Sequence, residues 1–103
     1  MRFLVTIQFS TEAGNAFVKN PSFGEKLQTI FTEQKAESVY FGARDGKRTL
    51  SYVTDLNDAA RIPAVMEPWW LSGATLVDAI PVFTPQEMQK VSGEIAALAK
   101  KWG

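Results

Sequence analysis

The fold is decided by residues 38–54, which read SVYFGARDGKRTLSYVT. Two runs rich in aromatic and β-branched residues flank the dipeptide Asp45-Gly46, which suits the positive φ angles of a two-residue type I′ turn. We therefore predict a β-hairpin with strands at 38–44 and 47–54. The turn sets the cross-strand pairs Arg44 with Lys47, Phe41 with Leu50, and Val39 with Tyr52.

Opposed residues share a face of a sheet, so this pairing gives the hairpin two different sides. The more apolar side carries Val39, Phe41, Ala43, Leu50 and Tyr52, joined by Arg48. The other side carries Tyr40, Thr49, Ser51 and Val53. A three-residue loop with a bulge would shift this assignment by one residue, and the sequence leaves that alternative open.

Strands and helices alternate around the hairpin. A strand is predicted at 2–9, where apolar residues recur at every second position. A helical region at 12–34 is interrupted at Asn20-Pro21, because proline disfavours helix at the preceding residue. Ser22 to Glu25 fits a capping box for its second half. A second helical region at 58–71 is segmented by Pro63 and Pro68.

The last part of the chain combines a strand with an amphipathic helix. The strand is predicted at 76–83, with Pro81 placing it at a sheet edge or at its end. Thr84 to Glu87 then forms a capping box with proline at the first helical position. Apolar residues follow at steps of three and four, so this helix must dock on something. They are Met88, Val91, Ile95, Leu98 and Trp102.

This order of elements predicts one α+β domain over residues 1–103. The expected architecture is a ferredoxin-like βαββαβ sandwich, with a four-stranded antiparallel sheet, helices on one side, and an added C-terminal helix. The other sheet face has no covering element in the chain, although it carries Tyr40 and Val53. We therefore expect a homodimer formed through the open sheet face.

Composition narrows the functional classes. Eleven basic and eleven acidic residues give a net charge of zero, so the sequence predicts no nucleic-acid partner and no membrane partner. The chain has no cysteine and no histidine, which argues against disulfides, thiolate catalysis, most transition-metal sites and the usual haem ligand. No apolar run has the length of a membrane span or a secretory signal. We expect a cytoplasmic protein with no cofactor and no metal.

Several short motifs give the chain a family resemblance over nearly its whole length. They are Tyr40-Phe41, Asp45-Gly46 with Arg48, Glu67-Pro68-Trp69-Trp70, and Pro81 with Thr84-Pro85. With these motifs the chain resembles the dimeric α/β-barrel superfamily, and within it a bacterial group of uncharacterised function. The superfamily includes muconolactone isomerases, cofactor-free monooxygenases, haem-degrading enzymes, peroxidases and stress-response proteins. The resemblance implies sheet-to-sheet dimers and a pocket between sheet and helices. The haem-binding branches usually rely on a histidine, which this chain lacks.

Glu67 is the first candidate catalytic residue. A glutamate beside Trp69 and Trp70 suits proton transfer, because an apolar pocket raises the pKa of a carboxyl group. The alternative is that the indoles fill the core and that Glu67 caps a neighbouring segment or pairs with an arginine. Arg48 is the second candidate, because a guanidinium among apolar residues needs an anionic substrate or a structural partner such as Glu67 or Asp78.

The remaining candidates are side chains that would orient a substrate. Tyr40 and Tyr52 offer hydroxyl groups, and Trp69 and Trp70 offer apolar surface. Asp78 interrupts an apolar strand, so it is partnered, exposed at a dimer rim, or catalytic. Each of these residues also has an ordinary structural explanation.

The expected function is that of a homodimeric module that binds a small apolar or aromatic compound. As an enzyme it would work without a cofactor, by proton transfer or by monooxygenase-like chemistry that uses the substrate's own reactivity. The alternative is a non-catalytic structural or stress-related protein whose assembly is its function.

Overall fold

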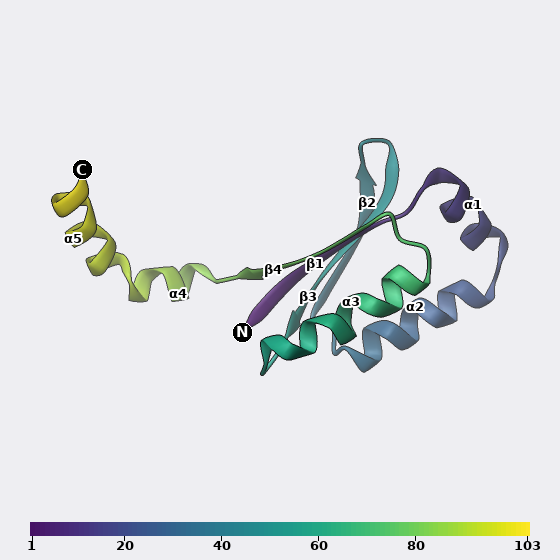
Figure 1. Ribbon diagram of the computed structural model, residues 1–103, viewed down its shortest axis with the longest axis horizontal. Coiled ribbons are helices and arrows are strands. Elements are labelled where there is room, and N and C mark those ends of the chain that lie inside the picture. The colour runs from purple at the N-terminus through teal and green to yellow at the C-terminus, as the bar shows by residue number, and fades with distance from the viewer.

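The computed structural model describes residues 1–103 and has an α+β architecture. Four strands, β1 (Arg2–Gln8), β2 (Ser38–Arg44), β3 (Lys47–Asp55) and β4 (Leu76–Val82), form one antiparallel sheet (Figure 1). The strand order is β2-β3-β1-β4. The predicted α+β class and the four-stranded antiparallel sheet are confirmed, and the fold is compatible with a ferredoxin-like arrangement.

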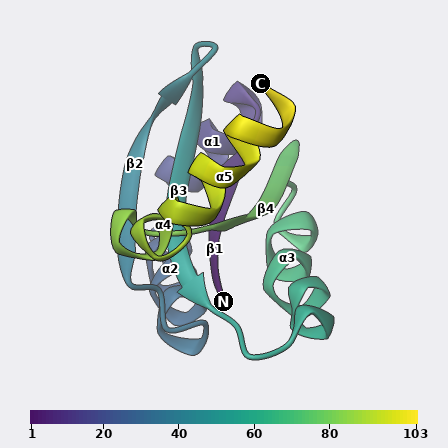
Figure 2. The ribbon, with the colours of Figure 1, turned by 90° about the vertical axis from the view of Figure 1, so that its left-hand side faces the viewer.

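Three helices lie on one side of the sheet: α1 (Thr11–Lys19), α2 (Ser22–Glu33) and α3 (Ile62–Leu71) (Figures 1 and 2). The break between α1 and α2 falls at Asn20-Pro21, as predicted from the proline. A short 3₁₀ helix, η1 (Ala59–Arg61), precedes α3, which confirms the predicted break near Pro63. The predicted interruption at Pro68 is wrong, because α3 continues through this residue.

The hairpin has the predicted register. Arg44 pairs with Lys47 and Phe41 with Leu50, and both turn residues have positive φ angles, 55° at Asp45 and 73° at Gly46. Such angles cost little for glycine and are tolerated by aspartate, which is why this dipeptide fixes the turn. The bulged alternative is therefore excluded.

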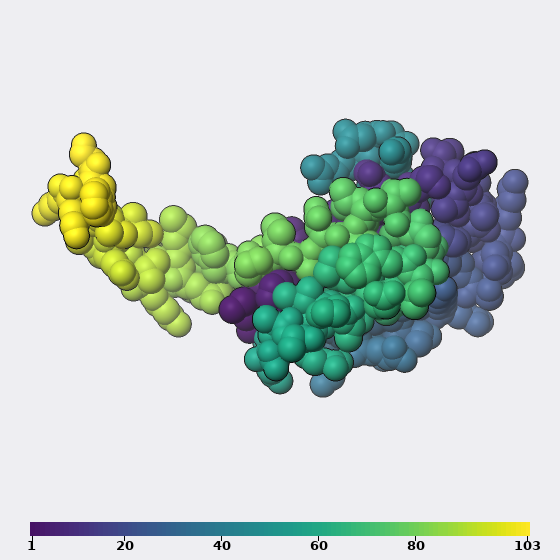
Figure 3. Space-filling view, in the orientation of Figure 1, coloured from purple at the N-terminus to yellow at the C-terminus, as the bar shows by residue number.

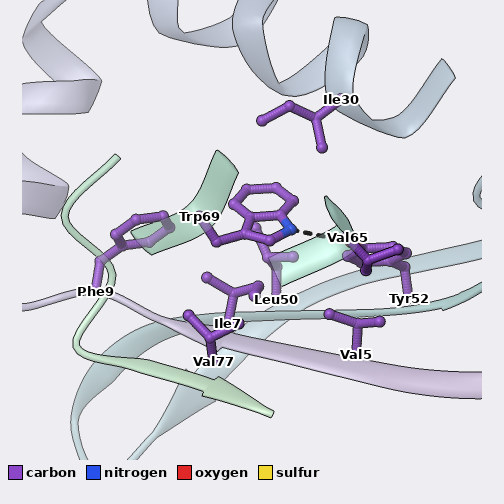
Figure 4. Packing of buried hydrophobic residues seen from close by; sticks show 9 residues of the cluster. All are labelled: Val5, Ile7, Phe9, Ile30, Leu50, Tyr52, Val65, Trp69 and Val77. Carbon is purple, nitrogen blue, oxygen red and sulfur yellow. Dashed lines mark hydrogen bonds between the residues drawn. The ribbon is translucent and has the colours of Figure 1, made fainter. Parts of the chain in front are cut away.

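The core lies between the sheet and the helices, and Tyr52 and Trp69 are completely buried in it (Figure 4). The Trp69 Nε1–H donates a hydrogen bond to the Tyr52 hydroxyl at 2.9 Å. That hydroxyl donates to the side-chain oxygen of Gln34, whose amide nitrogen donates to the Val65 carbonyl at 3.0 Å. With this chain of hydrogen bonds, no buried side-chain nitrogen or oxygen atom is left without a partner.

Two helix-terminus predictions are wrong. The expected single terminal helix is split into α4 (Pro85–Lys90) and α5 (Ser92–Trp102). At the split the Ser92 hydroxyl donates a hydrogen bond to the Gln89 carbonyl, and Gly93 weakens the first turn of α5. The start of α4 at Thr84 is nevertheless the predicted capping box. At α2, Ser22 forms no capping box, because the Asn20 side chain accepts from the Ser22 backbone N–H instead.

Residues 83–103, which we term the C-terminal arm, project away from the rest of the chain (Figures 1 and 3). Neither α4 nor α5 has a buried residue. The Cα radius of gyration is 17.2 Å, whereas a compact domain of this length has about 13 Å. The terminal helix was expected to dock, and within one chain it does not.

Replacing the buried tyrosine tests the core network. We expect Tyr52→Phe to destabilise the chain by about 1–3 kcal/mol, because the Trp69 N–H and the Gln34 oxygen each lose a buried partner. Tyr40→Phe is the matched control, since Tyr40 is exposed and its replacement should change stability by less than about 0.5 kcal/mol. Urea unfolding measures both, and equal effects would show that the network adds no stability.

The same tyrosine predicts loss of stability at high pH. Burial raises the pKa of Tyr52 from 10.0 to about 12, with the Trp69 hydrogen bond opposing it. The fold favours the neutral phenol, so its stabilisation is complete below pH 10 and is lost as the pH rises towards 12. In the Tyr40→Phe variant Tyr52 is the only tyrosine, and its phenolate absorbance near 295 nm should appear only as the pH approaches 12. Ionisation at pH 10 without unfolding would contradict the buried placement.

Candidate functional site

A groove opens between the sheet and the helices at the end where α1 and α2 meet the β2–β3 hairpin. Its volume is about 470 Å³. We term it the aromatic groove, because four phenylalanines and two leucines supply most of its apolar wall. They are Phe9, Phe17, Phe23, Leu27, Phe41 and Leu50.

Three phenylalanines of the aromatic groove, Phe9, Phe17 and Phe23, pack on one another and form a rigid wall. Phe17 and Phe23 are stacked with their ring centroids 3.8 Å apart. Phe9 meets Phe17 edge-on at 4.9 Å. Such contacts fix the rings at small cost in side-chain entropy, so the apolar wall exists before any ligand binds.

Arg48 is the only charged residue that lines the aromatic groove. Its side chain lies over Gly14 of α1, where an added Cβ would come within 2.6 Å of a guanidinium nitrogen. The predicted structural pairing of Arg48 with Glu67 or Asp78 is wrong, because the two ion pairs of the chain are Met1 with Asp55 and Arg2 with Glu37. The guanidinium therefore faces an apolar groove without a carboxylate partner.

The aromatic groove continues along β2. A second hollow of about 580 Å³ lies between α2 and β2 and shares Gly24, Leu27 and Phe41 with it. The second hollow stays open because β2 is poorly covered. In β2 only Val39 is half-buried, and the other residues of the strand are exposed. Lys35 is the one charged residue that lines this second hollow.

The opposite face of the sheet, which we term the open face, is uncovered in the chain. A polar row crosses its centre, in which Thr6 stands opposite Ser51 and Asp78 in the neighbouring strands, and Tyr40 extends the row beyond Ser51. Apolar side chains adjoin the row. They are Leu4, Val53, Leu76, Ile80 and Val82.

The structure does not bring the predicted site residues together. Tyr52 and Trp69 lie in the core, with no exposed surface. Tyr40, which is 71% exposed, lies on the open face, together with Asp78. Glu67 and Trp70 are exposed on α3.

Of the predicted residues, only Arg48 lines the aromatic groove. The sequence reasoning missed Gly14 and the aromatic wall contributed by Phe9, Phe17 and Phe23. The signal was the presence of three phenylalanines at and after the end of the first strand, but such residues are indistinguishable from core by pattern alone.

The structure contains no cluster of three or more acidic or metal-binding side chains that could hold a metal ion. None of its helices combines the length and the apolar character that crossing a bilayer requires. The chain matches no family model, and no curated protein is significantly similar to it. Its function is therefore argued from the geometry.

Gly14→Ala tests the placement of Arg48. The added methyl group should displace the guanidinium while leaving the fold intact, because alanine is the better helix former by about 1 kcal/mol and the clashing atoms belong to a flexible side chain. Gly24→Ala is the control, since a Cβ there meets no atom within 4 Å. The Arg48 Nε–H resonance should shift in Gly14→Ala alone, and an unmoved resonance would contradict this packing.

Proposed function

We propose that the chain is a homodimeric module that binds a small apolar or aromatic compound bearing an acidic group. The ligand's apolar part lies in the aromatic groove and its acidic group on Arg48. One observation carries the proposal: the only charged side chain of an aromatic-walled groove has no carboxylate partner.

The chemistry of the groove supports an anionic ligand. A guanidinium presents paired N–H donors that match the two oxygens of a carboxylate. Stacked phenylalanine rings beside it favour a flat or branched hydrocarbon part, and a groove of about 470 Å³ suits a small molecule. The chain's net charge of zero leaves Arg48 as the local source of attraction.

The proposed assembly is a sheet-to-sheet dimer, as in the dimeric α/β barrels of bacteria that the sequence resembles. The open face supports it, because its apolar side chains flank a polar centre and no helix of the chain covers them. Two copies related by a two-fold axis would place identical open faces against each other. We propose the cytoplasm as the location of this dimer.

The reaction class, where the module acts as an enzyme, is cofactor-free proton transfer or monooxygenase-like chemistry. In that role Arg48 would hold the substrate's anionic group, and Glu67 would move the proton. Glu67 does not line the aromatic groove, so its participation requires a substrate that reaches α3. Tyr40, Trp70 and Asp78 would contact substrate only where a second copy completes the site.

A non-catalytic structural or stress-related role is the alternative. The packing of Trp69 and Tyr52 favours it, because these two large aromatics fill the core and enclose no cavity between them. Under this alternative the surfaces left bare by the chain serve assembly alone.

A matched pair of probes tests the binding proposal. We expect 3-phenylpropanoate to bind at least about 10-fold more tightly than its neutral amide, because a hydrogen bond to a charged group contributes about 1.5–3 kcal/mol. Arg48→Met should abolish this preference and leave amide binding unchanged. Lys47→Met, a neighbouring charge outside the groove, should retain the preference.

Calorimetric titration and amide chemical-shift mapping measure the two affinities and the place of binding. Equal affinity for acid and amide, or a preference that survives Arg48→Met, would refute the anionic ligand. Absence of shifts at the groove phenylalanines would refute the groove.

A charge placed on the open face tests the dimer. Val53→Lys should raise the dimer dissociation constant at least about 10-fold, because the ammonium would be desolvated between two sheets. Asn15→Lys, on the exposed side of α1, adds the same charge and should leave the constant unchanged. Sedimentation equilibrium decides between them, and an unaffected Val53→Lys dimer would place the interface elsewhere.

A further inference from the structure

The C-terminal arm carries an unpartnered apolar surface, which we term the arm stripe. Its exposed residues recur on one side of α4 and α5 and on the segment that leads into them. Trp102 is 77% exposed and Phe83 69%. The six members are Phe83, Met88, Val91, Ile95, Leu98 and Trp102.

Helices as short as those of the arm need a packing partner. α4 has 6 residues and α5 has 11, whereas isolated helices below about 12–15 residues are marginal in water. The capping box at Thr84 contributes only about 1 kcal/mol at one end. Because neither helix buries a residue against its own chain, the partner must come from outside it.

The amount of exposed surface gives the size of the missing contact. The chain exposes 7320 Å², whereas a compact monomer of its mass exposes about 5,800 Å². The excess is larger than the roughly 800 Å² that each partner contributes to a standard interface. One second copy, which brings an equal excess of its own, supplies enough surface to cover it.

The position of the arm points to the same occupant as the open face. In Figure 1 the arm continues past the end of β4 and away from α1 and α2, and Figure 2, seen from that end, shows α5 in front of the sheet. Facing sheets lie about 10 Å apart, and an 11-residue helix is about 16 Å long. The arm can therefore reach past a sheet that covers the open face, and a two-fold axis makes the contact reciprocal.

We propose that the C-terminal arm is an exchanged clasp: each copy packs its arm stripe on a second copy of this chain and closes around the open-face dimer. Because the net charge of the chain is zero, no overall electrostatic repulsion opposes this association. This inference shares its second copy with the proposed function but rests on a different surface.

Two pairs of charges on α5 test the clasp. Ile95→Glu with Leu98→Glu places carboxylates on the arm stripe, and the dimer dissociation constant should rise at least about 100-fold because they cannot be buried unpaired. Ala96→Glu with Ala97→Glu adds the same charge to the other side of α5, where it should change the constant by less than about 3-fold. Sedimentation equilibrium of the full chain measures both.

Fluorescence gives a readout that does not depend on mass. The difference in acrylamide quenching between the unmodified chain and Trp102→Phe reports the exposure of Trp102. Trp102 should be shielded in the dimer and become accessible in Ile95→Glu with Leu98→Glu. A quenchable Trp102 in the unmodified dimer would overturn the inference.

The variants also separate the two surfaces. If Val53→Lys dissociates the dimer and the arm-stripe variant does not, the clasp is wrong while the open-face dimer stands. If the chain is a monomer that sediments with phosphatidylglycerol vesicles in a manner dependent on Ile95 and Leu98, the arm binds a lipid surface instead, and the clasp is wrong.

Discussion

The structure depends on a core that is one-sided. Phe3, Val5 and Ile7 of the central strand β1 are buried by helices on one face of the sheet, and Trp69 is anchored there through Tyr52 and Gln34. The other face of the same strand presents Leu4 and Thr6 with nothing from the chain above them. The sheet has helices on one side only, and the arm turns away from its own domain. Another molecule is therefore needed to cover the open face and the arm stripe.

Local chemistry made much of the fold predictable. Asp45-Gly46 allowed the hairpin register to be derived pair by pair, and proline positions marked the breaks at Asn20 and around Pro63. The undocked arm was not predictable, because the periodicity that identifies an apolar stripe does not say which chain buries it. The split at Val91 depends on one side-chain hydrogen bond from Ser92 to the backbone, which competes with helix in a way that pattern cannot weigh.

The candidate site was less predictable than the fold. Arg48 was identified because a guanidinium among apolar residues needs an anionic substrate or a structural partner, and the structure places it, exposed, in the lining of a groove. Trp69 and Tyr52 were candidates for a ligand site with core packing as the alternative, and the structure places both in the core. Aromatic residues serve both purposes, so only their neighbours distinguish the two. The groove itself arises where the edge strand β2 is left uncovered by α2, a consequence of chain geometry rather than of any motif.

The central claim is that this chain is incomplete as a single copy. Sedimentation equilibrium of the unmodified chain at micromolar concentrations tests it most directly. The account predicts a species with twice the 11.4 kDa chain mass. A chain that remains monomeric through that range, with its open face and arm stripe still bare, would contradict it.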